Sequence, residues 1–233
     1  MITSAQIIGG RSLGGAELFY ARLVSALHRR GHSTLAVTVP GSLIATELPP
    51  DMPQLHIAMR GIWDWWARWQ IQKAMRQQRP DIVQTYMGRA TRLTHLPAGQ
   101  RPIHIARLGG YYEPHSYRHA HAWVVVSAGI GDHLIRHGFP RHRVFHISNF
   151  VTPGEPRSSI ALQQLRQTLT IPEDGLIVTA VGRLHPIKGF NDLLTAFAAL
   201  PASIHDRPVY LVIVGDGPLA AALQHQAEQL GVA

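Results

Sequence analysis

An arginine and a lysine, Arg183 and Lys188, stand five residues apart in the stretch VGRLHPIKGF. An apolar run ends just before them and a helix-like segment follows, so the pattern places them at the mouth of a predicted strand. Ligands of open α/β sheets bind outside the carboxyl ends of the strands, and Gly182 lets the backbone approach a ligand closely. Two cations beside a helix N-terminus suit a diphosphate. From the spacing alone, a solvated basic loop is the simpler explanation.

Two further glycine-rich stretches follow predicted strands. In VGDGPL, Gly215 and Gly217 come after the next strand along the chain, and an ordinary tight turn explains them if they are taken singly. In GGRSLGGAELF, Gly14 and Gly15 open a predicted helix. This loop is rich in backbone donors, but it does not match GxGxxG and has no acidic residue at a ribose position. Dinucleotide binding of the usual Rossmann kind is therefore not predicted.

The composition limits the partners. The formal net charge of +8 at pH 7 and the 15 histidines favour phosphate esters, acidic glycans, an anionic membrane face or nucleic acid. Without cysteine the chain has neither disulfides nor thiolate metal sites. His115 and His119 are four residues apart, but no third ligand is fixed by spacing, so we predict no metal site. We find neither a signal peptide nor a membrane span, and expect a cytoplasmic protein.

The element pattern predicts a doubly wound α/β fold. Short apolar runs that are typical of strands buried on both faces alternate with helix-length segments. We predict strands at 5–8, 35–39, 55–59, 82–86, 103–108, 123–126 and 144–147. The helices that separate them are predicted at 16–30, 63–78 and 128–137, the last with Ser127 as its N-cap.

The stretch NFVTPGEPRSS, residues 149–159, reads as an interdomain connector because its prolines and glycine interrupt both periodicities. We therefore predict one domain over 1–150 and a second over 151–233. In the second domain, helices at 159–169, 191–200 and 219–230 alternate with strands at 176–181 and 209–214. Two strands are few for an open sheet, so we expect the second domain to be incomplete, through a truncated gene or because the chain is a fragment.

Three stretches together resemble glycosyltransferase family 4. They are GGAELFYARLVSALHRRGH (14–32), VGRLHPIKGFNDLLTAF (181–197) and LVIVGDGPLAAALQHQAEQLG (211–231). Between them, PDIVQTYMGRATRL (80–93), ARLGGYY (106–112) and HISNFV (146–151) are similar to the branch that acts on the lipopolysaccharide core or related cell-envelope acceptors. The resemblance implies the GT-B fold of two Rossmann-like domains. It also implies transfer of a sugar, with retention, from a nucleotide-diphosphate sugar, and no further cofactor.

The resemblance assigns roles position by position. Gly182, Arg183 and Lys188 match the residues that grip the donor diphosphate, and Gly14 and Gly15 match the loop that approaches the donor phosphates or the acceptor. It implies an N-terminal acceptor-side domain and a C-terminal donor-binding domain. The family's glutamate motif falls beyond Ala233, and Gly110 stands near the place where many relatives carry a histidine. The catalytic residues are therefore unknown. The acceptor-side candidates are Arg89, Arg107 and Tyr111.

Several alternatives stay open. A chain without the glutamate motif is expected to be inactive as it stands, which makes a noncatalytic remnant or a nucleotide-binding module the alternative function. A sugar epimerase shares the architecture. The basic residues are spread along the chain without a nucleic-acid-binding motif, so no specific nucleic acid is expected. The stretch WDWWARWQ, residues 63–70, is explained either by packing or by peripheral contact with an anionic membrane at its inner face.

Overall fold

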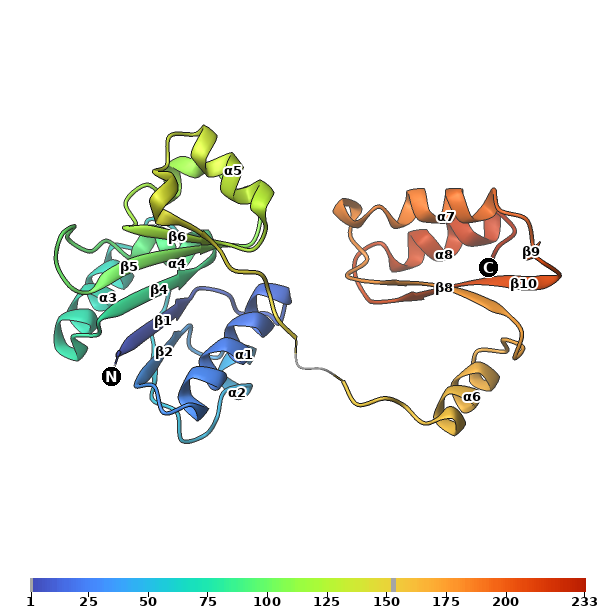
Figure 1. Ribbon diagram of the computed structural model, residues 1–233, viewed down its shortest axis with the longest axis horizontal. Coiled ribbons are helices and arrows are strands. Elements are labelled where there is room, and N and C mark those ends of the chain that lie inside the picture. The colour runs from blue at the N-terminus through green and yellow to red at the C-terminus, as the bar shows by residue number, and fades with distance from the viewer. Residues whose placement is uncertain (1, 152–153) are drawn as a thin grey trace. The chain divides into compact units, whose positions relative to one another are not determined.

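The chain folds into two α/β units. The computed structural model describes residues 2–151 and 154–233 and divides into a unit of Met1–Thr152 and a unit of Pro153–Ala233 (Figure 1).

The first unit is built on one parallel sheet of seven strands in the order β3-β2-β1-β4-β5-β6-β7. Every neighbouring pair in this sheet is parallel, so all the carboxyl ends meet at one edge. The strands are β1 (Ser4–Ile8), β2 (Thr34–Thr38), β3 (Gln54–His56), β4 (Ile82–Tyr86), β5 (Ile103–Leu108), β6 (Ala122–Val125) and β7 (Val144–His146).

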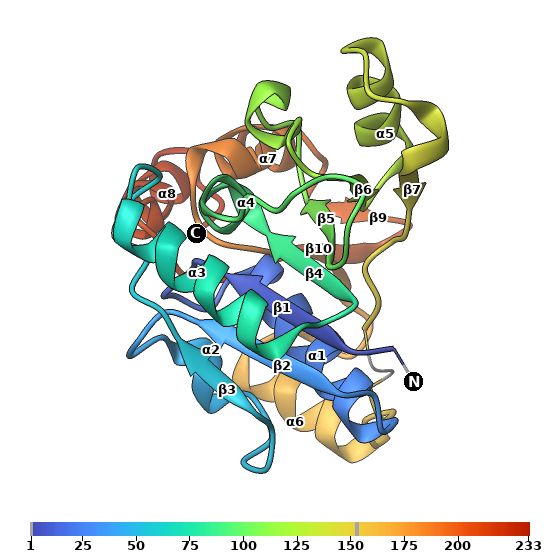
Figure 2. The same cartoon turned by 90° about the vertical axis from the view of Figure 1, so that its left-hand side faces the viewer.

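Side chains alternate between two cores on the two faces of this sheet. Ile7 packs among residues of α3 (Trp65–Gln78), whereas its neighbour Ile8 packs among residues of α1 (Gly15–Arg29). Both isoleucines are fully buried. Because successive side chains of a strand point to opposite faces, α1 and α3 cover opposite sides of the sheet, as Figure 2 also shows. This is the doubly wound arrangement that the unbroken apolar runs predict.

Helix boundaries follow capping side chains. Asp64 caps α3 by accepting from the Ala67 N–H, so the helix begins two residues after the predicted start at Trp63. Ser127 caps α5 (Ala128–Arg136), which confirms the predicted N-cap. The helices α2 (Leu43–Thr46) and α4 (Met87–Leu93), and the 3-10 turns η1 (Pro114–Tyr117) and η2 (Arg141–Arg143), were not predicted. Both are short, at four and seven residues, and α4 has Tyr86 at its N-cap, which is not a residue that marks a helix start.

The strand β3 ends three residues before the predicted end at Met59. Beyond His56, the Ile57 N–H still donates to the Thr38 carbonyl of β2 at 2.9 Å, and Ile57 and Met59 remain buried in the core. The apolar pattern at 58–59 therefore records burial and not strand pairing.

The second unit holds a smaller sheet in the order β8-β10-β9. The parallel pair of β8 (Leu176–Val181) and β10 (Arg207–Val214) was predicted, but the antiparallel β9 (Ser203–Ile204) was not. His205 and Asp206 make the tight β9–β10 turn with φ of 49° and 60°. The remaining elements are α6 (Ser159–Thr168), η3 (Pro186–Lys188), α7 (Phe190–Ala198) and α8 (Ala220–Gln229).

Helices α7 and α8 cover one face of this smaller sheet (Figure 1). Phe190, Leu194 and Leu223 form the buried core there, packed against apolar residues of β8 and β10. On the other face, Ile177, Val181 and Val214 are 37%, 76% and 51% exposed. The second sheet thus has one covered and one open side in the described part of the chain.

Among the residues that the structure describes, no helix combines the length and the apolar character needed to cross a bilayer.

Candidate functional site

The strand order of the first sheet reverses between β1 and β4. From β1 the chain adds β2 and β3 on one side, and from β4 it adds β5, β6 and β7 on the other. Such a reversal opens a crevice at the carboxyl ends of the two strands, where open α/β sheets bind ligands. Arg89, an acceptor-side candidate, lies at this reversal. Its Nη1 donates to the Gly9 carbonyl and to the Met59 carbonyl, both at 3.2 Å. Arg89 therefore fixes the loops that follow β1 and β3.

Gly14 and Gly15 lie in the loop that leads from β1 into α1. Gly14 is the extended N-cap of the helix, and Gly15 is its first residue. Glu17 lies under this loop and is 6% exposed. A Cβ at Gly14 would come within 2.8 Å of Glu17 Oε2, and one at Gly10 would overlap the same carboxylate. Gly10 and Gly14 thus leave room for this acidic side chain, whereas a Cβ at Gly15 would meet no atom within 4 Å.

Met87 marks backbone strain at the same crevice. It follows β4 directly and has φ of 65°, a left-handed conformation that is costly for a residue with a long side chain. Strained residues of this kind gather at ligand sites. Nothing in the sequence signalled this conformation, since left-handed positions are usually marked by Gly or Asn.

The other two acceptor-side candidates have different environments. Arg107 is 5% exposed, and its Nη2 donates to Asn149 Oδ1 at 2.8 Å and to the Ile147 carbonyl at 3.3 Å. Its guanidinium also lies over the Phe19 ring, 4.0 Å from the centroid. Burial lowers the pKa of Arg107 from its usual high value. Tyr111, in contrast, is 66% exposed.

In the second unit, the loops that follow β8 and β10 are joined backbone to backbone. The Gly182 N–H donates to the Val214 carbonyl at 3.0 Å, and the Leu184 N–H donates to the Asp216 carbonyl at 2.9 Å. Leu184 is buried, whereas Arg183 beside it is exposed. Anchoring Leu184 thus turns the Arg183 side chain outward at the carboxyl end of the sheet.

Gly215 allows this contact. A Cβ at Gly215 would overlap the Gly182 carbonyl oxygen, and one at Gly217 would overlap the backbone of Leu184. The tight turn that the sequence predicted is therefore also a point of contact between two loops. Lys188 ends η3 and is exposed, and Gly189 follows it with φ of 69° at the N-cap of α7. In the described part of the chain, neither Arg183 nor Lys188 forms a salt bridge.

Gly182, Arg183 and Lys188 lie on the one segment between β8 and α7 in the second unit, and Gly14, Gly15 and Arg89 follow the neighbouring strands β1 and β4 in the first. Tyr111 lies at the surface of the first unit and contacts His133 edge to face, with ring centroids 5.4 Å apart. Of the paired histidines weighed as metal ligands, His119 is engaged by its Nε2, 2.8 Å from the Thr91 carbonyl. Across the described residues, no three His, Asp or Glu side chains are grouped as metal ligands would be.

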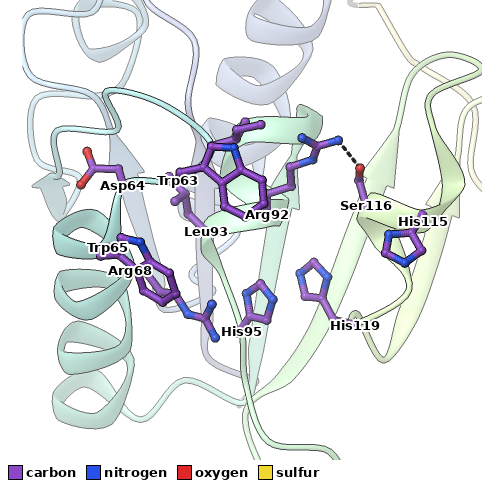
Figure 3. A pocket seen from close by; sticks show the side chains of 11 residues that line it. Trp63, Asp64, Trp65, Arg68, Arg92, Leu93, His95, His115, Ser116 and His119 are labelled. Atoms are coloured by element: carbon purple, nitrogen blue, oxygen red, sulfur yellow. Dashed lines mark hydrogen bonds between the residues drawn. The ribbon is translucent and has the colours of Figure 1, made fainter.

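Sequence reasoning missed a cavity of about 390 Å³ in the first unit (Figure 3). It lies between the start of α3, the end of α4 and the segment around η1. Arginine, histidine and tryptophan side chains line it, chiefly Trp63, Trp65, Arg68, Arg92, His95 and His119. The residue types stood out in the sequence, but their convergence from three separate segments did not.

Two Rossmann-like units with glycine-rich loops at their strand ends are the architecture of GT-B proteins, as predicted. Residues 13–155 match the sequence profile of Glycosyltransferase Family 4, and residues 163–233 match that of Glycosyl transferases group 1. The first match alone covers more than half of the chain. The chain therefore belongs to Glycosyltransferase Family 4.

Individual relatives agree with this family. The chain is 29% identical over 222 residues to the lipopolysaccharide core biosynthesis glycosyltransferase LpsD of Rhizobium meliloti (strain 1021), which covers 94% of this chain. The chain spans 61% of the length of that relative. Its fold is similar to that of Anabaena Alr3699/HepE in complex with UDP and glucose, with a TM-score of 0.72 at 17% identity, over 99% of this chain and 67% of the other.

The fold by itself does not select the reaction. A UDP-GlcNAc 2-epimerase from Neisseria meningitidis bound to UDP-GlcNAc is also similar, with a TM-score of 0.55 at 11% identity, over 100% of this chain and 71% of the other. Transfer and epimerisation thus occur on related scaffolds. The family membership rests on the sequence.

Replacing Gly215 by Ala should destabilise the second unit, because the added methyl overlaps the Gly182 carbonyl and must push the two loops apart. We expect a loss of about 1–3 kcal/mol in the free energy of unfolding, as for other overpacked sites. Urea unfolding followed by circular dichroism measures it. Gly154→Ala is the control, since a methyl there meets no atom within 4 Å. Equal midpoints for both variants would show that the loops do not pack in this way.

Proposed function

We propose that this protein transfers a sugar, with retention, from a nucleotide-diphosphate sugar to a cell-envelope acceptor such as the lipopolysaccharide core or a similar glycolipid. The family membership and the likeness to LpsD support the class of reaction and of acceptor. The observation that carries the proposal is the exposed pair of Arg183 and Lys188 at the carboxyl end of the second sheet. In this proposal the second unit binds the donor and the first unit binds the acceptor.

The donor site is built from the loops after β8 and β10. Arg183 and Lys188 hold the diphosphate, and the free N–H groups at the start of α7 add donors. As the bond to the sugar breaks, negative charge builds on the departing diphosphate, and the two cations stabilise it. Gly182 keeps the backbone close to the phosphates. The proposal invokes no metal and no cofactor besides the nucleotide sugar.

The acceptor side is the crevice after β1 and β4. Gly14 and Gly15 let a ligand approach the backbone there, and the bonds from Arg89 to Gly9 and Met59 hold the loops in place. Arg107 is buried and contributes by positioning, because its hydrogen bonds to Ile147 and Asn149 hold the segment after β7. The exposed Tyr111 is the candidate with the most freedom to touch an acceptor. No residue of the chain is assigned the chemical step.

The alternative function is nucleotide binding without transfer, in a noncatalytic remnant or a nucleotide-binding module. It needs the same donor site, so nucleotide affinity does not separate the two. Release of the nucleoside diphosphate from a nucleotide sugar in the presence of cell-envelope glycolipid does, because only transfer or hydrolysis frees it.

Arg183→Ala should weaken binding of the matching nucleoside diphosphate at least about tenfold, since a charge-assisted phosphate contact is lost. Calorimetric titration with UDP, GDP and ADP measures this, with Lys188→Ala tested in parallel. Arg157→Ala is the matched control, because it removes another exposed arginine of the second unit. If all variants bound as the unchanged chain does, the diphosphate site would lie elsewhere.

We further propose that the start of α3 contacts an anionic membrane at its cytoplasmic face. Trp63, Trp65 and Trp66 are 78%, 72% and 63% exposed, which is unusual for such large apolar side chains. Trp66 and Trp69 stack with centroids 4.7 Å apart, and Lys73 Nζ lies 5.0 Å from the Trp69 centroid. Indoles beside cations suit the headgroup region of a bilayer.

Replacing both Trp66 and Trp69 by Ala should reduce binding to phosphatidylcholine vesicles that contain phosphatidylglycerol by about tenfold or more, because two indoles are lost from the interface. Vesicle sedimentation measures it. Phe145→Ala, which removes a half-exposed aromatic ring from β7, should leave binding unchanged. Binding that persists in the double variant would locate the membrane contact on another surface or remove it.

A further inference from the structure

The cavity in Figure 3 is separate from the crevice after β1 and β4. Its lining comes from the start of α3, from Arg92 and His95 at and after the end of α4, and from the segment around η1. None of the residues assigned to the donor or the acceptor side lines it. Its volume of about 390 Å³ is in the range of small-molecule sites. We call it the Trp63–Arg92 pocket.

The pocket is positively charged. Arg68 and Arg92 both line it, and in the described part of the chain neither forms a salt bridge with a carboxylate. Asp64 is the acidic residue of the lining, but its oxygens accept from the Ala67 and Arg60 N–H groups, both at 3.0 Å. These bonds lower the pKa of Asp64 and tie it to the start of α3. The two guanidinium groups remain to attract an anion.

His95 adds a donor that an anion can recruit, whereas His119 Nε2 is already bonded to the Thr91 carbonyl at 2.8 Å. The rings of His95 and His119 are parallel, with centroids 4.0 Å apart, and His95 Nδ1 is buried without a hydrogen-bond partner in the described structure. Burial, then His119 and then Arg68 lower the pKa of His95 to about 4, so its ring is neutral near pH 7. The charged or titratable groups facing it are Arg68, His119 and His104. A bound anion would favour the protonated ring.

The mouth of the pocket is aromatic. Trp63 and Trp65 line it and remain 78% and 72% exposed, and the Arg68 guanidinium lies 5.7 Å from the Trp65 centroid. A free phosphate ion has no surface to place against an indole. A sugar ring has one, because its C–H groups form an apolar face that packs on aromatic rings. The two indole rings and the arginine side chains together suit a ligand that has both a sugar ring and an anionic group.

We propose that the Trp63–Arg92 pocket binds a phosphorylated sugar, with Arg68 and His95 holding the phosphate monoester and Trp63 and Trp65 packing against the sugar ring. Arg68 and His95 are neighbours in Figure 3, whereas Arg92 is turned toward Ser116 Oγ, to which its Nη2 donates, and adds positive charge to the pocket from that side. That this sugar is part of the acceptor rests on the proposed function. That the pocket binds a phosphorylated sugar does not depend on the proposed function.

Glucose 6-phosphate, titrated calorimetrically into the chain without any nucleotide, tests the proposal. It should bind at least about tenfold more tightly than either glucose or inorganic phosphate, because only it uses both parts of the pocket. Arg68→Gln should weaken binding about tenfold, and Arg76→Gln, an exposed arginine on the same helix, should not. Trp63→Leu should weaken binding, whereas Trp69→Leu, outside the pocket, should not.

Proton uptake gives a second readout. Titrations near pH 6 in buffers of different ionisation enthalpy should show that binding takes up more protons in the unchanged chain than in His95→Gln, because the phosphate stabilises the protonated ring. Affinities for glucose 6-phosphate that are equal to those for inorganic phosphate, or unaffected by Arg68→Gln in a folded protein, would overturn the proposal. If the chain failed to bind glucose 6-phosphate but still bound a nucleoside diphosphate, the pocket proposal would be wrong and the proposed donor site would be unaffected.

Discussion

Parallel pairing is the constraint on which the candidate sites depend. Because the seven strands of the first sheet and the β8–β10 pair of the second run in parallel, the loops after the strands emerge at the carboxyl edge of each sheet. Residues far apart in the chain, such as Gly9 and Arg89, are then brought within hydrogen-bonding distance. The direction of the strands therefore places the loops of each unit at one edge of its sheet, whatever side chains the loops carry.

Backbone contact also explains the glycines of the second unit. The loops after β8 and β10 touch through Gly182 and Gly215, where a side chain would not fit. Their hydrogen bonds bury Leu184 and leave Arg183 exposed. The same loop contact thus packs Leu184 into the core and points Arg183 toward a ligand. A loop held by its backbone presents a cation in a fixed direction and loses little conformational freedom when a ligand binds.

The sequence predicted whatever depended on local patterns. Unbroken apolar runs located the strands, and Ser127 marked a helix start. It missed what depended on distant partners: β9 needs the tight turn at His205 and Asp206, and the Trp63–Arg92 pocket needs Arg68, Arg92 and His119 from three segments. Arg107 illustrates the same limit, because its bond to Asn149 spans 42 residues and no local pattern reveals it.

The central claim is that the loops after β8 and β10 hold a diphosphate. The most direct measurement is a nitrogen-15 NMR titration of the chain with UDP, GDP or ADP, compared with the nucleoside alone. We predict that one nucleotide moves the amide resonances of Gly182, Lys188, Gly189 and Gly215, and that its nucleoside moves them far less. Shifts confined to the first unit, or equal shifts with nucleoside and nucleotide, would contradict it.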